Sequence, residues 1–97
     1  MIRHVVVFAW VPEATDQQKQ QVADELRKLP PLMTGLRAYH FGPDAGIIDG
    51  NFDFAVVADF DDADSYIGYR DSDVHQDIIR RFSRPNTKPR AAVQYEI

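Results

Sequence analysis

The segment Ile2–Trp10 limits the fold more than any other part of the chain, because it has the pattern of a strand that is largely apolar on both faces. One face carries the larger side chains together with His4, and the other carries mainly valine and alanine. A sheet with one face in water alternates cleanly between apolar and polar residues, since successive side chains of a strand point to opposite faces. We therefore expect both faces of this strand to be covered.

Three further segments alternate in a similar way and are bounded by glycine, proline or aspartate, which is typical of strands. In the middle one, the larger side chains from Phe52 to Phe60 share one face, while Ala55 and Val57 lie on the other. The four predicted strands span residues 2–10, 35–44, 52–60 and 90–97.

Two helical regions separate these strands. The sequence Thr15–Gln18 has the form of a capping box and predicts a helix to about Lys28, where a pair of prolines ends it. After the third strand, an aspartate can cap a short helix through Tyr69, and Ser72 can cap a second helix over about residues 73–82. The second helical region is therefore predicted to be broken.

The order strand, helix, strand, strand, helix, strand predicts an α+β fold with one ferredoxin-like domain over residues 1–97. In this split β-α-β arrangement, both helical elements cover the same face of a four-stranded antiparallel sheet. The other face would expose Val5, Val7, Ala55 and Val57. We therefore predict a homodimer in which two sheets pack face to face.

Charge and composition exclude several classes of protein. A net charge of -4 argues against nucleic-acid binding, which needs clustered lysine and arginine. We interpret the basic run from Arg80 to Arg90 as a solvated helix end, with contact to an anionic ligand as the alternative. The apolar N-terminus is too short to span a bilayer or to act as a secretory signal, so we expect a cytoplasmic protein without a membrane partner.

The sequence also gives no indication of a cofactor or a metal. It contains no cysteine, which excludes disulfides and thiolate ligands, and no glycine loop with the spacing of a phosphate-binding motif. The acidic group Asp59, Asp61, Asp62 and Asp64 lacks the ligand order of a calcium loop. Helix capping explains these aspartates without a metal ion.

Four stretches of the chain together resemble a known family. They are "IRHVVVFAW", "GLRAYHFGPD", "DFAVVADFDD" and "YRDSDVHQDIIRRF". In order and spacing they resemble the stress-responsive dimeric α/β-barrel (Dabb) domain family over essentially the whole chain. The resemblance implies a homodimer whose two sheets form a dimeric α/β barrel, with a pocket in each subunit between the sheet and the helices.

Relatives in this family include a plant polyketide cyclase, whose pocket uses a histidine on the last helix, a nearby tyrosine and a second histidine on the first strand. The resemblance assigns these roles to His75, Tyr69 and His4. Two features depart from the family pattern. Ser72 and Asp73 replace a histidine and a proline of the helix motif, and a leucine of the first helix replaces the phenol of the cyclase.

The residues themselves also favour a site at His75. It lies on the apolar face of its helix, four residues before Ile79, and His4 lies on the face of the first strand that we assign to the helix side. Burial would lower the pKa of both histidines and keep the imidazoles neutral. We expect the rest of the pocket to be lined by Val6, Phe8, Trp10, Val22, Leu26, Phe54, Val56 and Ile79.

These groups suggest a reaction. A neutral histidine paired with a tyrosine can remove a proton from a carbon between two carbonyls, while a phenol donates to the developing enolate oxygen. The prediction is a pocket for a small carbonyl or aromatic molecule, with cofactor-free enolisation or aldol-type cyclisation as in a lyase or isomerase. Two alternatives stay open: a non-catalytic, stress-related structural or assembly module, and a cofactor-free oxygenase suggested by fold analogy.

Overall fold

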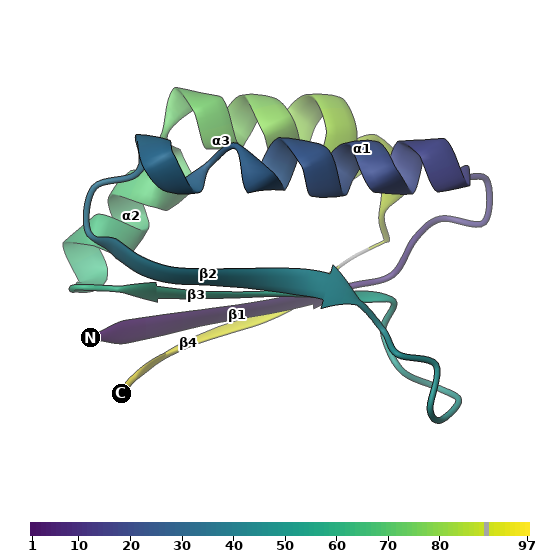
Figure 1. Cartoon of the computed structure of the whole chain (residues 1–97), viewed down its shortest axis with the longest axis horizontal. Helices are drawn as coiled ribbons and strands as arrows, with labels where there is room; N and C mark the ends of the chain where they lie inside the picture. Colours follow the sequence, from purple (N-terminus) through teal and green to yellow (C-terminus); the bar gives the residue numbers. More distant parts are fainter. Residues whose placement is uncertain (89) are drawn as a thin grey trace.

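The computed structural model describes residues 1–88 and 90–97. Its strands form one antiparallel sheet in the order β2-β3-β1-β4, and the helices lie on a single face of that sheet (Figure 1). The predicted α+β, ferredoxin-like fold is confirmed. The strands are β1 (Ile2–Phe8), β2 (Leu36–Pro43), β3 (Phe54–Phe60) and β4 (Ala91–Glu96).

Three α-helices and three short turns of other helical types connect the strands. None of the helices in the described residues is long and apolar enough to cross a membrane. The elements are α1 (Asp16–Arg27), α2 (Ala63–Asp71), α3 (Asp73–Ile78), the 3-10 turns η1 (Pro30–Leu32) and η3 (Arg84–Asn86), and the π-helical turn η2 (Ile79–Ser83).

Helix α1 begins with the predicted capping box. The Thr15 hydroxyl accepts a hydrogen bond from the backbone N–H of Gln18 at 3.1 Å, and the Gln18 side chain accepts one from the backbone N–H of Thr15 at 2.8 Å. Two of the amides left free at the helix start are thereby satisfied. The inner face of the helix buries Val22 and Leu26 against the sheet, and Leu29 is buried just beyond its end.

The predicted break in the second helical region is also confirmed. Ser72 has extended backbone angles, and its hydroxyl accepts from the backbone N–H of His75 at 3.2 Å while donating to the Tyr69 carbonyl at 3.0 Å. Ser72 therefore ends α2 and caps α3 at the same time. As a result, His75 lies in the first turn of α3, next to the C-terminal end of α2.

The second half of this region differs from the sequence prediction. A regular helix was expected as far as residue 82, but after Ile78 the chain forms the π-helical turn η2. Such single wide turns inside helical segments are rare and often occur at functional sites. Ile79 and Ser83, the first and last residues of this turn, both line the same cavity.

Two predicted strands are shorter than expected at the same end of the sheet. Asp53 explains both differences: its backbone N–H donates to the Phe8 carbonyl at 3.0 Å, while its carboxylate accepts from the backbone N–H of Trp10 at 2.9 Å. This side chain takes the place of strand pairing there, so β1 ends at Phe8 and β3 begins at Phe54. Phe52, predicted to share the large face of its strand, is 45% exposed instead.

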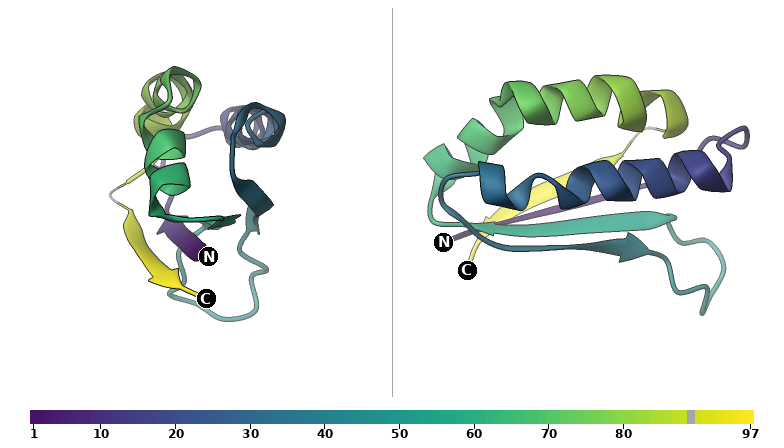
Figure 2. Two further views of the ribbon diagram at one scale, coloured as in Figure 1. Left: turned by 90° about the vertical axis from the view of Figure 1, so that its left-hand side faces the viewer. Right: turned by 45° about the horizontal axis from the view of Figure 1, so that its top comes forward.

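The sheet has one covered and one open face (Figure 2). On the covered face, His4, Val6 and Phe8 of β1 are buried beneath the helices, together with the larger residues of β3. The open face carries Val5 and Val7 of β1, paired in register with residues 57 and 93 and with residues 55 and 91 of the neighbouring strands. The predicted division of side chains between the two faces of β1 is confirmed.

The connection between β2 and β3, residues 44–53, turns to the side of the sheet away from the helices (Figures 1 and 2). Its tip exposes two large apolar side chains: Ile47 is 84% exposed and Ile48 is 66% exposed. This apolar tip therefore lies on the same side of the molecule as the open sheet face.

Gly35 fixes how the start of β2 packs against α2, and a matched pair of variants tests this. Gly35 and Gly46 both have positive φ, at 77° and 73°, but a Cβ added at Gly35 would overlap Ser65, whereas one at Gly46 meets open space. We expect Gly46→Ala to lower the free energy of unfolding by about 1 kcal/mol and Gly35→Ala by about 3 kcal/mol. Urea denaturation at one protein concentration measures both, and equal losses would contradict the contact with Ser65.

Candidate functional site

A cavity of about 440 Å³ lies on the covered face, between β1, the helical segment from α3 to η3, and the chain that leads into β4. Its interior contains the buried histidines and apolar side chains, and its mouth contains exposed polar and basic residues. The lining consists of His4, Val6, Phe8, Leu26, Val56, Tyr69, Arg70, His75, Gln76, Ile79, Ser83, Arg84, Thr87, Lys88 and Arg90.

The break between α2 and α3 sets the orientation of His75. The carbonyl of Arg70, near the end of α2, is one of those that a helix terminus leaves without an intrahelical partner. It lies 3.1 Å from His75 Nδ1 and also accepts from the Gln76 side chain at 2.6 Å. Because a carbonyl can only accept, His75 Nδ1 must carry the proton, and in the neutral ring Nε2 is left as a proton acceptor.

His4 is held in the opposite tautomer. Its Nδ1 lies 2.9 Å from the side-chain nitrogen of Gln94, the residue paired with it in the register of β1 and β4. Because an amide N–H donates, His4 Nδ1 accepts, and in the neutral ring Nε2 carries the proton. The two histidines therefore offer different chemistry through the same ring atom: His75 Nε2 can accept a proton, and His4 Nε2–H can donate a hydrogen bond.

Both Nε2 atoms are accessible from the cavity. Neither forms a hydrogen bond to a protein group within residues 1–88 and 90–97, yet no buried side-chain nitrogen or oxygen in this part of the chain lacks a partner. The two atoms must therefore have solvent access, and both histidines line the cavity. Water or a ligand in the cavity is their natural partner.

Tyr69 lies close to both histidines. Its ring lies 4.2 Å from that of His75 and 6.2 Å from that of His4, measured between ring centroids. Its hydroxyl is 3.1 Å from the hydroxyl of Tyr39 on β2 and forms no hydrogen bond to His75. Tyr69 therefore supports the His75 ring through a tilted ring-to-ring contact.

The electrostatics keep all of these groups uncharged at neutral pH. Burial, followed by the positive charge of Arg90 and by repulsion from His75 when that ring is protonated, lowers the pKa of His4 to about 4. Burial and Arg90 also lower the pKa of His75, although its bond to the Arg70 carbonyl opposes the shift. Burial raises the pKa of the Tyr69 phenol, which therefore stays protonated. The site consists of two neutral imidazoles and a neutral phenol.

The structure brings together the three predicted site residues, His4, Tyr69 and His75, around one cavity. Of the eight predicted lining residues, Val6, Phe8, Leu26, Val56 and Ile79 line it. The other three lie outside the lining: Trp10 and Phe54 pack against Phe8 and each other, and Val22 is fully buried beneath α1. Phe54 and Val22 belong to the buried core beyond the cavity, and Trp10 is partly buried against that core.

The sequence prediction missed most of the cavity mouth. Arg84, Lys88 and Arg90, which were assigned to a solvated helix end, all line the cavity. The signal for this was present: η3 has a proline directly after Arg84, and the chain must then pass from the helix layer to the sheet to enter β4. A basic segment that connects the helix layer to the sheet in this way lies at the open end of a pocket formed between the two layers.

Three of the four acidic residues considered for a metal have other partners. Asp59 forms a two-bonded ion pair with Arg3, at 2.7 and 3.0 Å, and Asp61 forms one with Arg37. Asp62 caps α2. In the described part of the chain, no group of three or more histidine, cysteine, aspartate or glutamate side chains is arranged to hold a metal ion.

The family model of the "Stress Responsive A/B Barrel Domain" (Dabb) matches residues 2–97 of this sequence. The chain belongs to this family. A dimeric ferredoxin-like protein of unknown function from Thermobifida fusca YX is 40% identical, with a TM-score of 0.91; the match covers 99% of this chain and 90% of that one. No curated protein matches the sequence.

Two more distant structures share the fold. A Dabb family protein from Mesorhizobium loti is 19% identical with a TM-score of 0.82, and the match covers 99% of this chain and 95% of that chain. A hydroxynitrile lyase from Passiflora edulis is 17% identical with a TM-score of 0.85, covering 99% and 92%. The dimeric state of the relative from Thermobifida fusca supports a homodimer for this chain.

The low pKa of His4 makes the stability of the protein depend on pH. A histidine that is harder to protonate when folded binds more protons when unfolded, so its contribution is complete above pH 6.5 and is lost as the pH falls toward 4. We expect the free energy of unfolding to fall by about 3 kcal/mol across this window because of His4. Denaturation at several pH values measures the slope.

The matched control is His4→Asn, which keeps an acceptor near Gln94 but does not titrate, so the slope should become shallower. The aspartates with lowered pKa, such as Asp59, lose their contribution only below about pH 4, outside this window. An unchanged slope in His4→Asn would contradict the assigned environment of His4.

Proposed function

We propose that the protein is a homodimer whose cavity binds a small carbonyl or aromatic molecule and catalyses cofactor-free proton transfer, in the form of enolisation or aldol-type cyclisation. One observation carries this proposal: two buried, neutral histidines present Nε2 atoms of opposite proton character to one cavity. Proton abstraction beside a carbonyl needs such a pair, because one group must accept the proton while another stabilises the oxygen that becomes negative.

The chemical steps follow from these atoms. His75 Nε2 takes the proton from the carbon beside a carbonyl, and the electron pair of that C–H bond moves to form the enolate. His4 Nε2–H donates a hydrogen bond to the enolate oxygen. In enolisation, His75 then returns its proton to that oxygen; in cyclisation, the enolate carbon attacks a second carbonyl of the same molecule, and the new alkoxide takes the proton. Both reactions balance without an oxidant or a cofactor.

The role proposed for Tyr69 changes in the light of its contacts. We expected its phenol to donate to the enolate, but its hydroxyl is engaged with Tyr39, whereas its ring supports His75. His4 Nε2–H is better placed for the donor role, and Tyr69 becomes a positioning residue. A hydroxynitrile lyase with the same fold supports the view that this fold can carry an enzyme site.

The proposed dimer interface is the open face of the sheet. It carries an apolar group centred on β1, with Val93 and Tyr95 of β4 exposed at 54% and 45% in the single chain. The apolar tip at Ile47 and Ile48 lies on the same side and would extend the contact. An apolar sheet face of this kind is normally buried by a second layer, and a two-fold axis lets the same surface serve both subunits.

A matched pair of valine variants tests this interface. Val93 on the open face and Val74 on α3 are exposed at 54% and 44% in the single chain. We expect Val93→Glu to dissociate the dimer, because a carboxylate would be buried between the sheets, and Val74→Glu to leave it intact. Sedimentation velocity measures the mass, and a dimer that survives Val93→Glu would contradict the proposed interface.

Asparagine variants separate catalysis from a structural role of the histidines. In His75→Asn, the amide N–H can still donate to the Arg70 carbonyl, but no base remains at the position of Nε2. In His4→Asn, the amide oxygen can still accept from Gln94, but the Nε2–H donor is lost. Both variants should therefore fold and dimerise.

The readout is the exchange of the central C–H protons of benzoylacetone with deuterium, followed by NMR above the rate in buffer. We expect His75→Asn to slow the catalysed exchange by about 100-fold or more and His4→Asn by about 100-fold. Catalysis by the wild type should fall as the pH drops below the ordinary histidine range, because protonated His75 is no base. Exchange at the buffer rate with wild-type protein would instead favour a non-catalytic module.

A further inference from the structure

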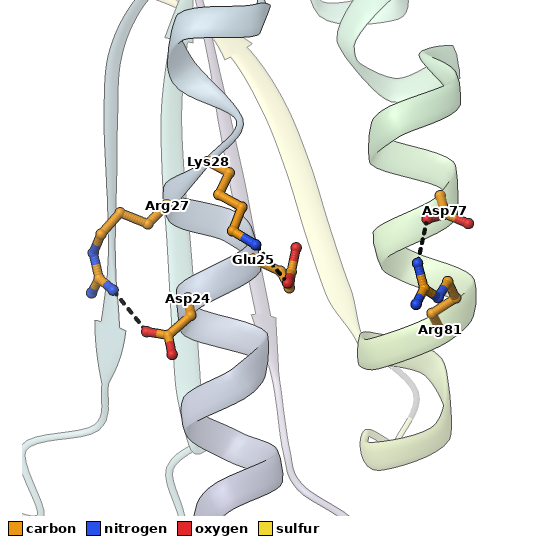
Figure 3. A network of polar contacts seen from close by, with 6 residues as sticks. All are labelled: Asp24, Glu25, Arg27, Lys28, Asp77 and Arg81. Carbon is orange, nitrogen blue, oxygen red and sulfur yellow. Dashed lines mark hydrogen bonds and ion pairs between the residues drawn. The ribbon is translucent and has the colours of Figure 1, made fainter.

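The basic residues of this chain fall into two groups. The sequence has eleven lysine and arginine residues, and eight of them form ion pairs with carboxylates in the described part of the chain. On the helices, for example, Asp24 pairs with Arg27 and Asp77 pairs with Arg81 (Figure 3). Pairing is therefore the rule for cations on this protein, as expected for a chain with excess acidic residues.

The remaining three cations, Arg84, Lys88 and Arg90, form no ion pair within residues 1–88 and 90–97, and all three line the cavity. All three are exposed, which places them at its mouth. The cavity lining contains no aspartate or glutamate. Like charges that share a rim repel one another, and an anion between them would relieve that repulsion.

The inside of the cavity has the opposite character. Val6, Leu26, Val56 and Ile79 line it with apolar side chains, together with the two histidines. A ligand that fits both regions has an apolar body and one charged end. This lining matches the chemistry of a small amphiphilic anion, whereas nucleic-acid binding would need a longer basic surface and a less acidic chain.

We propose that the mouth of the cavity is an anion subsite, in which Arg84, Lys88 and Arg90 hold a terminal oxyanion of the ligand, a carboxylate or a phosphate ester. The apolar part of that ligand lies against the inner wall, and its reactive carbonyl lies between these two ends, beside His75 and His4. This inference rests on the proposed function, because it specifies the ligand of the same cavity. Arg and Lys side chains bind such oxyanions through charge-assisted hydrogen bonds.

Calorimetry with three probes of similar shape tests the subsite in the wild-type dimer. Phenylpropanoate carries a carboxylate, benzylacetone replaces one carboxylate oxygen with a methyl group, and phenethyl phosphate carries a phosphate ester. We expect the acid to bind about 10-fold or more tightly than the ketone. Raising the ionic strength from about 20 mM to about 300 mM should weaken binding of the acid and leave the ketone unchanged.

Glutamine variants test which basic residues cause the preference for the acid over the ketone. Arg90→Gln and Lys88→Gln should each reduce the preference for the acid over the ketone. Arg81→Gln is the control, because Arg81 is paired with Asp77 and lies outside the cavity lining. This variant should keep the full preference.

The outcomes separate this proposal from the proposed function. Equal binding of all three probes would overturn the anion subsite and leave the small-molecule cavity standing. A preference for either anion that disappears in Arg90→Gln supports the subsite, and the relative affinities of the carboxylate and the phosphate identify the group. If such binding leaves the ring signals of both histidines unshifted in NMR spectra, the subsite stands and the proposed chemistry fails. Failure of all three probes to bind would overturn both.

Discussion

The hydrogen bond between His75 Nδ1 and the Arg70 carbonyl determines what the rest of the site can do. It exists because Ser72 ends α2 and starts α3, which leaves the Arg70 carbonyl free of the helical pattern and places His75 above it. In an unbroken helix, this carbonyl would accept from a backbone N–H four residues later. The break therefore fixes the tautomer of His75 and directs its basic nitrogen into the cavity.

Strand β1 links this site to the proposed assembly. Its covered face supplies His4, Val6 and Phe8 to the cavity, while Val5 and Val7 on the other face belong to the open apolar surface. Because side chains alternate along a strand, a shift of one residue in register would exchange the two faces. The pairing of β1 with both neighbouring strands therefore fixes which of its side chains face the cavity and which face the proposed interface.

The features that could be predicted from the sequence are those with a local signal. The capping box at Thr15, the cap at Ser72 and the alternation of β1 each depend on a few neighbouring residues, and each is confirmed. The strand ends at Trp10 and Phe52 were wrong, because the side chain of Asp53, distant in sequence from Trp10, replaces their pairing. Periodicity gives the face on which a side chain lies but no position along that face.

The details of the site depend on contacts between distant segments. The tautomer of His4 follows from its register with Gln94, ninety positions later in the chain, and no local pattern reports that register. The basic residues after Phe82 were visible in the sequence, but their place at the cavity follows from the return of the chain from η3 to β4. In both cases the missing information was three-dimensional pairing and not residue type.

The most direct test of this account is the tautomeric state of the two histidines, read from long-range proton–nitrogen NMR correlations of the imidazole rings at neutral pH. We expect two neutral rings of opposite type, with the proton on Nδ1 in His75 and on Nε2 in His4. If both rings carry the proton on the same nitrogen, or if either is charged at neutral pH, one histidine cannot act as base while the other acts as donor, and the account of the site is contradicted.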